Sequence, residues 1–184
     1  MDWTIEFDKA IEQYLPDLEV LQDEPMSRHT TFRIGGPAKR MAFPSSREQL
    51  VLLMSFAKNY GANPLVIGNG SNLLVPDEGL DRLVIDTSAN LNRVERGSGN
   101  TVLADAGATL ARTADLACKS GLTGLEFAHG IPGTVGGDEA CAPICGGAVP
   151  GGGHPDAFLR GTEFELPAQS ADGASGGGGA VRGI

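Results

Sequence analysis

The chain has 184 residues, of which 41% are hydrophobic, a composition that can bury the core of one ordinary domain or of two small ones. Its formal net charge of −9 argues against a nucleic-acid-binding surface, because such a surface needs clustered Lys and Arg. The sequence shows neither a signal peptide nor a stretch long and apolar enough to span a bilayer. We therefore expect a globular cytoplasmic protein that binds neither nucleic acid nor membrane.

Two helices are predicted in the first third of the chain. Apolar residues recur at helical spacing over residues 3–15, which form a leader helix that ends before Pro16. A second helix begins after a cap at Ser45 or Ser46 and ends at Gly61, with Ser45 and Glu48 at capping-box spacing. Its predicted apolar stripe consists of Leu50, Val51, Met54 and Ala57.

Short strands and one more helix are predicted in the middle of the chain. The strands are expected at 65–67, 73–75, 83–85 and 101–105, and the helix at 109–119, closed by Gly121. Regular alternation stops after Gly137. Residues 138–184 are rich in Gly and Pro, so we predict an irregular, disordered tail there.

The three cysteines do not indicate a disulfide framework, because they are few and unevenly placed. Cys118 falls within a predicted helix, and we interpret it as a small core residue. Cys141 and Cys145, followed by His154, lack a fourth ligand, so no metal is expected.

A glycine-rich loop, residues 68–72, follows the apolar strand 65–67 and reads Gly-Asn-Gly-Ser-Asn. The dinucleotide fingerprint G-x-G-x-x-G does not match, because Leu73 stands where the third Gly is required and no helix follows. Consecutive amides, helped by Ser71 and Asn72, can wrap a phosphate or diphosphate. The alternative is a hairpin turn, since Asn-Gly between apolar runs favours one.

Two further segments have a similar character. Residues 130–137 contain four glycines, Pro132 and a single side-chain donor, Thr134, and a plain linker is the alternative. Residues 29–37 include Arg33, which can offer a positive charge, and a Gly35-Gly36 pair that allows close backbone approach. The alternative for this segment is a strand that enters a turn, with Arg33 solvated.

His29 and His129 show no partners in the sequence. We interpret each of them as a structural or surface residue rather than a catalyst.

Taken together, residues 29–36, 66–75 and 121–137 resemble the UDP-N-acetylenolpyruvoylglucosamine reductases, also called UDP-N-acetylmuramate dehydrogenases, the flavoproteins of peptidoglycan precursor synthesis. The similarity covers roughly residues 20–137. It implies an α+β fold, the FAD-binding fold of the vanillyl-alcohol oxidase type. With the resemblance, we divide the chain into a leader helix at 1–24, a first FAD-binding subdomain at 25–88, the start of a second at 89–137, and an irregular or aberrant tail at 138–184.

The resemblance implies FAD as cofactor, held by residues from all three segments. In the first segment these residues are Arg33, Ile34 and Gly35, against the cofactor. In the second they are Gly68, Asn69, Gly70, Ser71, Asn72 and Leu73, around the diphosphate. In the third they are Gly130, Ile131, Pro132, Gly133, Thr134, Val135, Gly136 and Gly137, lining the flavin.

The activity implied by the resemblance is an NADPH-dependent oxidoreductase reaction. It reduces a nucleotide-sugar substrate, UDP-N-acetylglucosamine enolpyruvate, to UDP-N-acetylmuramate, which supports cell wall biogenesis, cell shape and cell division. The family continues after Gly137 with its catalytic Arg, Ser and Glu, whereas residues 138–143 depart from its pattern. We therefore assign no catalytic residue and expect a truncated form that is inactive alone.

Two alternatives stay open, a non-catalytic FAD-binding fragment and another FAD-linked oxidase of the same fold. The abrupt change of composition at residue 138 also suggests the hypothesis that the tail arises from a shifted reading frame.

Overall fold

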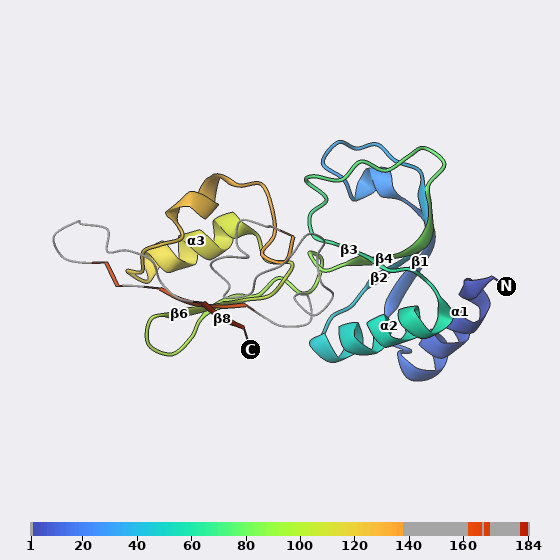
Figure 1. Cartoon of the computed structure of the whole chain (residues 1–184), viewed down its shortest axis with the longest axis horizontal. Helices are drawn as coiled ribbons and strands as arrows, with labels where there is room; N and C mark the ends of the chain where they lie inside the picture. Colours follow the sequence, from blue (N-terminus) through green and yellow to red (C-terminus); the bar gives the residue numbers. More distant parts are fainter. Residues whose placement is uncertain (1, 138–161, 167, 170–180, 184) are drawn as a thin grey trace. The chain divides into compact units, whose positions relative to one another are not determined.

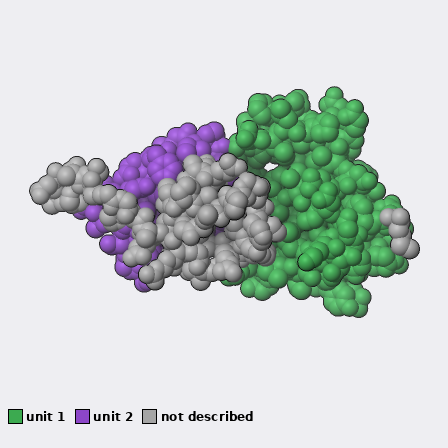
Figure 2. Space-filling view, in the orientation of Figure 1, with its two compact units in different colours: residues 1–91 green, residues 92–184 purple. Residues whose placement is uncertain are grey.

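The computed structural model describes residues 2–137, 162–166, 168–169 and 181–183. The chain divides into two compact units, Met1–Leu91 and Asn92–Ile184, which are coloured separately in Figure 2. No described helix has the length and apolar character needed to cross a membrane.

Unit 1 contains a four-stranded sheet in the order β1-β2-β4-β3. Its strands are β1 (Glu19–Pro25), β2 (Pro37–Phe43), β3 (Leu65–Ile67) and β4 (Leu80–Asp86). Strand β1 pairs with β2 in the antiparallel sense, whereas β2 and β3 both run parallel to β4. The final residues of β2 and β4 are buried in succession, as expected of central strands that are covered on both faces.

Helices α1 (Trp3–Tyr14) and α2 (Arg47–Tyr60) lie together on one face of this sheet, and the loop that carries the short helix η1 (Met26–Arg28) lies on the other (Figure 1). The boundaries of both helices agree with the sequence prediction. Of the two predicted caps of α2, Ser46 is the one that the structure uses, because its hydroxyl accepts from the Gln49 amide at 3.2 Å. Gly61 ends α2 in the left-handed conformation, with φ +72°.

The apolar stripe of α2 was predicted correctly at Leu50 and Ala57 and incorrectly at Val51. The buried side chains are Leu50, Leu53 and Ala57, whereas Val51 is 44% exposed. These three buried positions have the i, i+3, i+7 spacing of one helical face, and Leu53 is the residue that the prediction omitted. A core cluster of unit 1 on the sheet and its loops consists of Met26, Ala38, Met41, Phe43, Ile67, Val75 and Val84.

Two further predictions for unit 1 need correction. Residues 73–75 form no strand: Leu74 is exposed, and Val75 packs into the core from a loop. Strands β1 and β2 were not predicted, because Glu and Arg interrupt the apolar pattern that signals a strand.

Unit 2 contains a second four-stranded sheet, antiparallel throughout, in the order β5-β6-β7-β8. Its strands are β5 (Val94–Arg96), β6 (Thr101–Ala104), β7 (Thr162–Glu165) and β8 (Val181–Gly183). Helix α3 (Leu110–Lys119) and the short helix η2 (Glu126–Gly130) complete the unit. The core includes Val102, Ala104, Leu110, Ala114, Ala117, Leu125, Val135, Phe164 and Leu166.

Strand β7 corrects the prediction of an irregular tail for the part of 138–184 that the structure describes. It pairs with β6, and it brings Phe164 into the core with no exposed surface. Leu166, two residues further on, is 3% exposed, so both side chains face the core at the period of an extended chain. The other residues of the predicted tail, including Cys141, Cys145 and His154, lie outside the described residues.

Cys118 also differs from its prediction. It is exposed on α3 rather than part of the core, because the buried positions of that helix are Leu110, Thr113, Ala114 and Ala117.

Candidate functional site

The glycine-rich loop 68–73 starts at the carboxyl end of β3, beside the carboxyl end of β4. Ile67 pairs with Asp86, the last residues of these two parallel strands. The carbonyl of Ile67 accepts two hydrogen bonds from Thr87, one from its amide at 3.0 Å and one from its hydroxyl at 2.9 Å. In open sheets, ligands bind outside the carboxyl ends of parallel strands. The fold therefore places this loop where a ligand is expected.

The tip of this loop rests on the segment 29–36. Gly70 has φ +61°, and a Cβ there would overlap the carbonyl oxygen of His29. The carbonyl of Gly70 accepts a hydrogen bond from the Thr31 amide at 3.1 Å. Two of the three segments singled out in the sequence are thus in direct contact, and position 70 requires a glycine for this contact.

The Gly35-Gly36 pair packs against residues 75–79 of the same chain. A Cβ at Gly35, where φ is +122°, would stand 2.7 Å from the Cβ of Val75. The Gly36 amide donates to the carbonyl of Pro76 at 2.9 Å, and a Cβ at Gly36 would overlap backbone of Asp77. The close approach that these glycines allow is therefore an approach of the chain to itself.

Several polar groups of the site are directed away from the core. Between residues 69 and 72, no backbone N–H donates a hydrogen bond to a described acceptor. Asn69 and Asn72 are exposed, as is Arg33, whose φ of +55° is unusual for a residue with a side chain. Arg33 and Ile34 follow Thr31, whose amide donates to Gly70, so an exposed cationic and an exposed apolar side chain lie within three residues of this contact.

The third segment, 130–137, belongs to unit 2 and is held by backbone hydrogen bonds. The amides of Val135 and Gly136 donate to the carbonyls of Ala108 and Ala106 at 2.9 and 2.8 Å. At the start of α3, the Leu110 amide donates to the carbonyl of Gly133 at 3.1 Å. The segment is thus an ordered part of unit 2 and not a linker.

Thr134, the one side-chain donor of this segment, is 3% exposed. Its neighbour across an isolated bridge is Thr109, which caps α3 by accepting from the Arg112 amide at 3.3 Å. Residues 130–137 therefore border the N-terminus of a helix, where the dipole favours negative charge.

The sequence analysis missed Glu24, Asp86 and Thr87, which surround the first two segments. Thr87 and Asp86 could have been noticed, because they close a run of apolar residues with polar ones at the end of a strand. Among the described residues, no group of three or more His, Cys, Asp or Glu side chains is arranged to hold a metal ion.

The chain belongs to the FAD binding domain family, whose profile matches residues 38–154. This match covers β2 to β4 of unit 1 from residue 38 onward, together with the loops 68–73 and 130–137. It also continues past residue 137, where the sequence analysis expected the resemblance to end.

The resemblance to one group of reductases is confirmed. The chain is 45% identical over 142 residues to a UDP-N-acetylenolpyruvoylglucosamine reductase of Agathobacter rectalis, an alignment that covers 71% of this chain and 45% of the relative. It is 50% identical over 120 residues to the reductase of Moorella thermoacetica, covering 65% and 39%. The chain thus spans less than half the length of the curated relatives that it matches.

The chain is also similar to solved structures. The reductase of Thermus caldophilus is 30% identical, with a TM-score of 0.48, over 71% of this chain and 43% of that one. An alkyldihydroxyacetonephosphate synthase is 20% identical, with a TM-score of 0.52, over 77% and 30%. The second likeness shows the fold alone, and with the family match it identifies the FAD-binding fold of the vanillyl-alcohol oxidase type.

Proposed function

We propose that this chain is the FAD-binding part of a UDP-N-acetylenolpyruvoylglucosamine reductase. The observation that carries the proposal is the glycine-rich loop 68–73 at the carboxyl ends of β3 and β4, within a chain that the family profile matches. In this proposal the loop holds the FAD diphosphate, residues 33–35 lie against the cofactor, and residues 130–137 contact the flavin.

The residues of the loop fit a diphosphate group. Its amides at 69–72 have no described acceptor, and Gly70 has the left-handed conformation, with which successive amides of a turn can point to one side. Such a run of amides forms an anion-binding concavity, which Ser71 and Asn72 supplement as neutral donors. Arg33, exposed in the neighbouring turn, supplies a positive charge for the two negative phosphates.

In the reaction that we propose, bound FAD supplies hydride transfer from NADPH to the enolpyruvyl double bond of UDP-N-acetylglucosamine enolpyruvate. The product is UDP-N-acetylmuramate, a cytoplasmic precursor of peptidoglycan and thus a determinant of cell shape and division. The role of the described residues is to bind and orient the cofactor, and none of them is assigned to proton transfer.

A second candidate is FAD binding without turnover. It is favoured by the coverage of the curated relatives, since the chain spans 45% of one and 39% of another. In this case the described units hold the cofactor, and substrate reduction requires parts of the relatives that the alignments do not reach.

The two candidates are separated by a titration and an assay on the purified chain. FAD binding is measured by equilibrium dialysis and by the visible absorbance of the bound flavin. NADPH oxidation is then followed with and without the enolpyruvyl nucleotide. Substrate-dependent oxidation supports the reductase, and FAD binding without oxidation supports the second candidate. A chain that binds no FAD contradicts both.

A further inference from the structure

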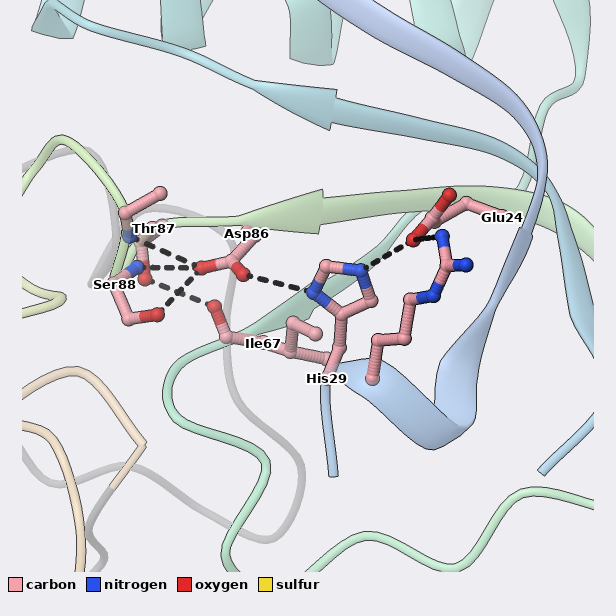
Figure 3. A network of polar contacts seen from close by, with 8 residues as sticks. Glu24, His29, Ile67, Asp86, Thr87 and Ser88 are labelled. Carbon is pink, nitrogen blue, oxygen red and sulfur yellow. Dashed lines mark hydrogen bonds and ion pairs between the residues drawn. The ribbon is translucent and has the colours of Figure 1, made fainter. Parts of the chain in front are cut away.

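The side chain of His29 lies between two carboxylates from different strands (Figure 3). Its Nε2 stands 3.0 Å from Oε1 of Glu24 on β1, and its Nδ1 stands 3.8 Å from Oδ2 of Asp86 at the end of β4. The three side chains are only 18%, 11% and 8% exposed. The ring also packs against Phe43, with 5.9 Å between ring centroids.

Both carboxylates have further partners that hold them in place. Oδ1 of Asp86 accepts from the amide and the hydroxyl of Ser88, both at 2.7 Å, and this leaves Oδ2 facing His29 (Figure 3). Oε1 of Glu24 also faces the Arg28 guanidinium at 3.4 Å, but the Arg28 side chain is 70% exposed. The imidazole therefore lies between two carboxylates, each on a different strand of the sheet.

The backbone of His29 supports the tip of the glycine-rich loop. Gly70 packs directly on the carbonyl of His29, and the next amide but one, that of Thr31, donates to Gly70. The start of the same loop, Ile67, is held by Thr87, the residue after Asp86. Both anchor points of the loop are thus within two residues of the Glu24–His29–Asp86 cluster.

We propose that His29 is a positioning residue for the loop 68–73. The ring bridges β1 and the end of β4, and in this way it fixes the position of the segment 29–31 relative to the sheet. This segment in turn sets the position of Gly70 and of the amides that follow it. A loop whose amides are already in place binds an anionic ligand without the entropic cost of ordering it. The inference deepens the proposed function, because the ligand that it invokes is the FAD diphosphate.

Positioning can be measured without any ligand, by amide hydrogen exchange of the whole chain observed by NMR. In the His29→Gln variant we expect the protection factor of the Thr31 amide to fall at least tenfold. The Gly36 amide, which donates to Pro76 in a neighbouring loop, and the amides of Met41 and Ala42 in β2 should keep their protection. Unchanged protection at Thr31 overturns the proposal, as does an equal loss at all four amides.

A matched control is Arg28→Gln, which removes the other partner of Glu24 but touches neither Asp86 nor the loop. It should leave Thr31 protected. Asp86→Asn is a second test variant in case His29→Gln does not fold, and it should also lower the protection of Thr31, because it removes the negative charge facing Nδ1.

FAD affinity gives the second readout. His29→Gln should raise the FAD dissociation constant about tenfold. Without FAD, its midpoint of thermal unfolding should differ from that of the unaltered chain by no more than the midpoint of Arg28→Gln does. A loss of affinity that only follows a loss of apo stability contradicts positioning. If the unaltered chain binds no FAD, the proposed function fails, and the exchange of Thr31 still decides the inference.

Discussion

Units 1 and 2 each combine a four-stranded sheet with helices, but they complete their cores in different ways. All strands of unit 1 lie within the first 91 residues, and three of its four strands are joined by parallel pairing around β4. Unit 2 is antiparallel, and its buried Phe164 arrives from β7, far along the chain from β6. Unit 1 thus depends on its glycine-rich loops for close packing, whereas the core of unit 2 depends on Phe164 from the distant strand β7.

The largest expected effect is at the distant strand. Phe164→Ala removes a fully buried aromatic side chain from the core of unit 2 and should destabilise that unit by about 3–5 kcal/mol. Denaturant unfolding should show the transition of unit 2 shifted or lost and that of unit 1 unchanged. Phe127→Ala, at a position that is 45% exposed in the same unit, is the control and should cost under about 1 kcal/mol. Equal effects of the two variants would mean that β7 is not part of the core.

A matched pair of glycines compares the two units next. Gly70 and Gly99 share a φ of +61°, but a Cβ at Gly99 meets nothing within 4 Å, whereas one at Gly70 overlaps His29. Gly99→Ala should therefore lower the free energy of unfolding by only about 1 kcal/mol, the strain of an alanine in the left-handed conformation. Gly70→Ala should cost about 3 kcal/mol and abolish most FAD binding, because the loop must also move. Each cost is read from the denaturant transition of its own unit, and similar costs would show that contact with segment 29–31 is unimportant.

The attachment of α1 to the sheet of unit 1 gives a smaller effect. Arg40 on β2 is mostly buried and binds Asp8 through two nitrogens, at 2.9 and 2.7 Å. Hydrogen bonding to Asp8 raises the pKa of Arg40. An arginine is charged at neutral pH even without such a partner, so removal of Asp8 leaves a charged guanidinium. Asp8→Ala should destabilise unit 1 by about 2 kcal/mol, because a buried donor loses its acceptor. Lys9→Ala breaks an exposed pair with Glu6 and should cost under about 0.5 kcal/mol in the same denaturation experiment.

The smallest effect is expected from pH, at the first turn of α1. Hydrogen bonds from Thr4 lower the pKa of Asp2, and the hydrogen bond from Lys39 lowers that of Asp81, while Asp81 in turn raises the pKa of Lys39. The carboxylates therefore stabilise this contact above their ordinary pKa of 3.8, and the contribution is lost as pH falls through the lowered values. Lys39 stabilises the same contact fully below its ordinary pKa of 10.5, and this stabilisation is lost as the pH rises through its raised pKa.

Trp3, the single tryptophan, reports this change, because its indole N–H donates to Asp81 at 3.3 Å. Its fluorescence should stay constant between about pH 5 and 9 and change outside that range. Asp81→Asn should remove most of the acid transition, and an unaltered transition in that variant would assign the change to another contact.

The parts of the fold that were predicted from sequence are those with local signals. Helices α1, α2 and α3 were placed by apolar spacing and by end signals such as Ser46 and Gly61, which act within a few residues. Strands β1, β2 and β7 were not, because their burial is decided by neighbours elsewhere in the chain. Phe164 and Leu166 do alternate, but their glycine-rich surroundings outweighed two apolar residues in that prediction.

The sequence singled out the two backbone segments of unit 1 that the structure brings together, but not the side chains that hold them. The glycines of segments 29–37 and 68–73 indicated close approach, and the structure brings these two segments together at Gly70 and Thr31. The side chains that hold these segments could not be predicted, because His29 contacts Glu24 and Asp86 only when β1 and β4 are part of the same sheet. Sequence spacing contains no information on that meeting.

The position of β7 has a consequence for how the protein is made. Residues of unit 1 leave the ribosome before those of unit 2, and they can complete their sheet at once. The apolar side of β6 and α3 must wait until Phe164 has been synthesised, and the chain from Ala104 to Thr162 must then close into a loop. We therefore expect unit 2 to fold more slowly than unit 1. Until Phe164 is in place, the incomplete core of unit 2 should expose the apolar surface that chaperones bind.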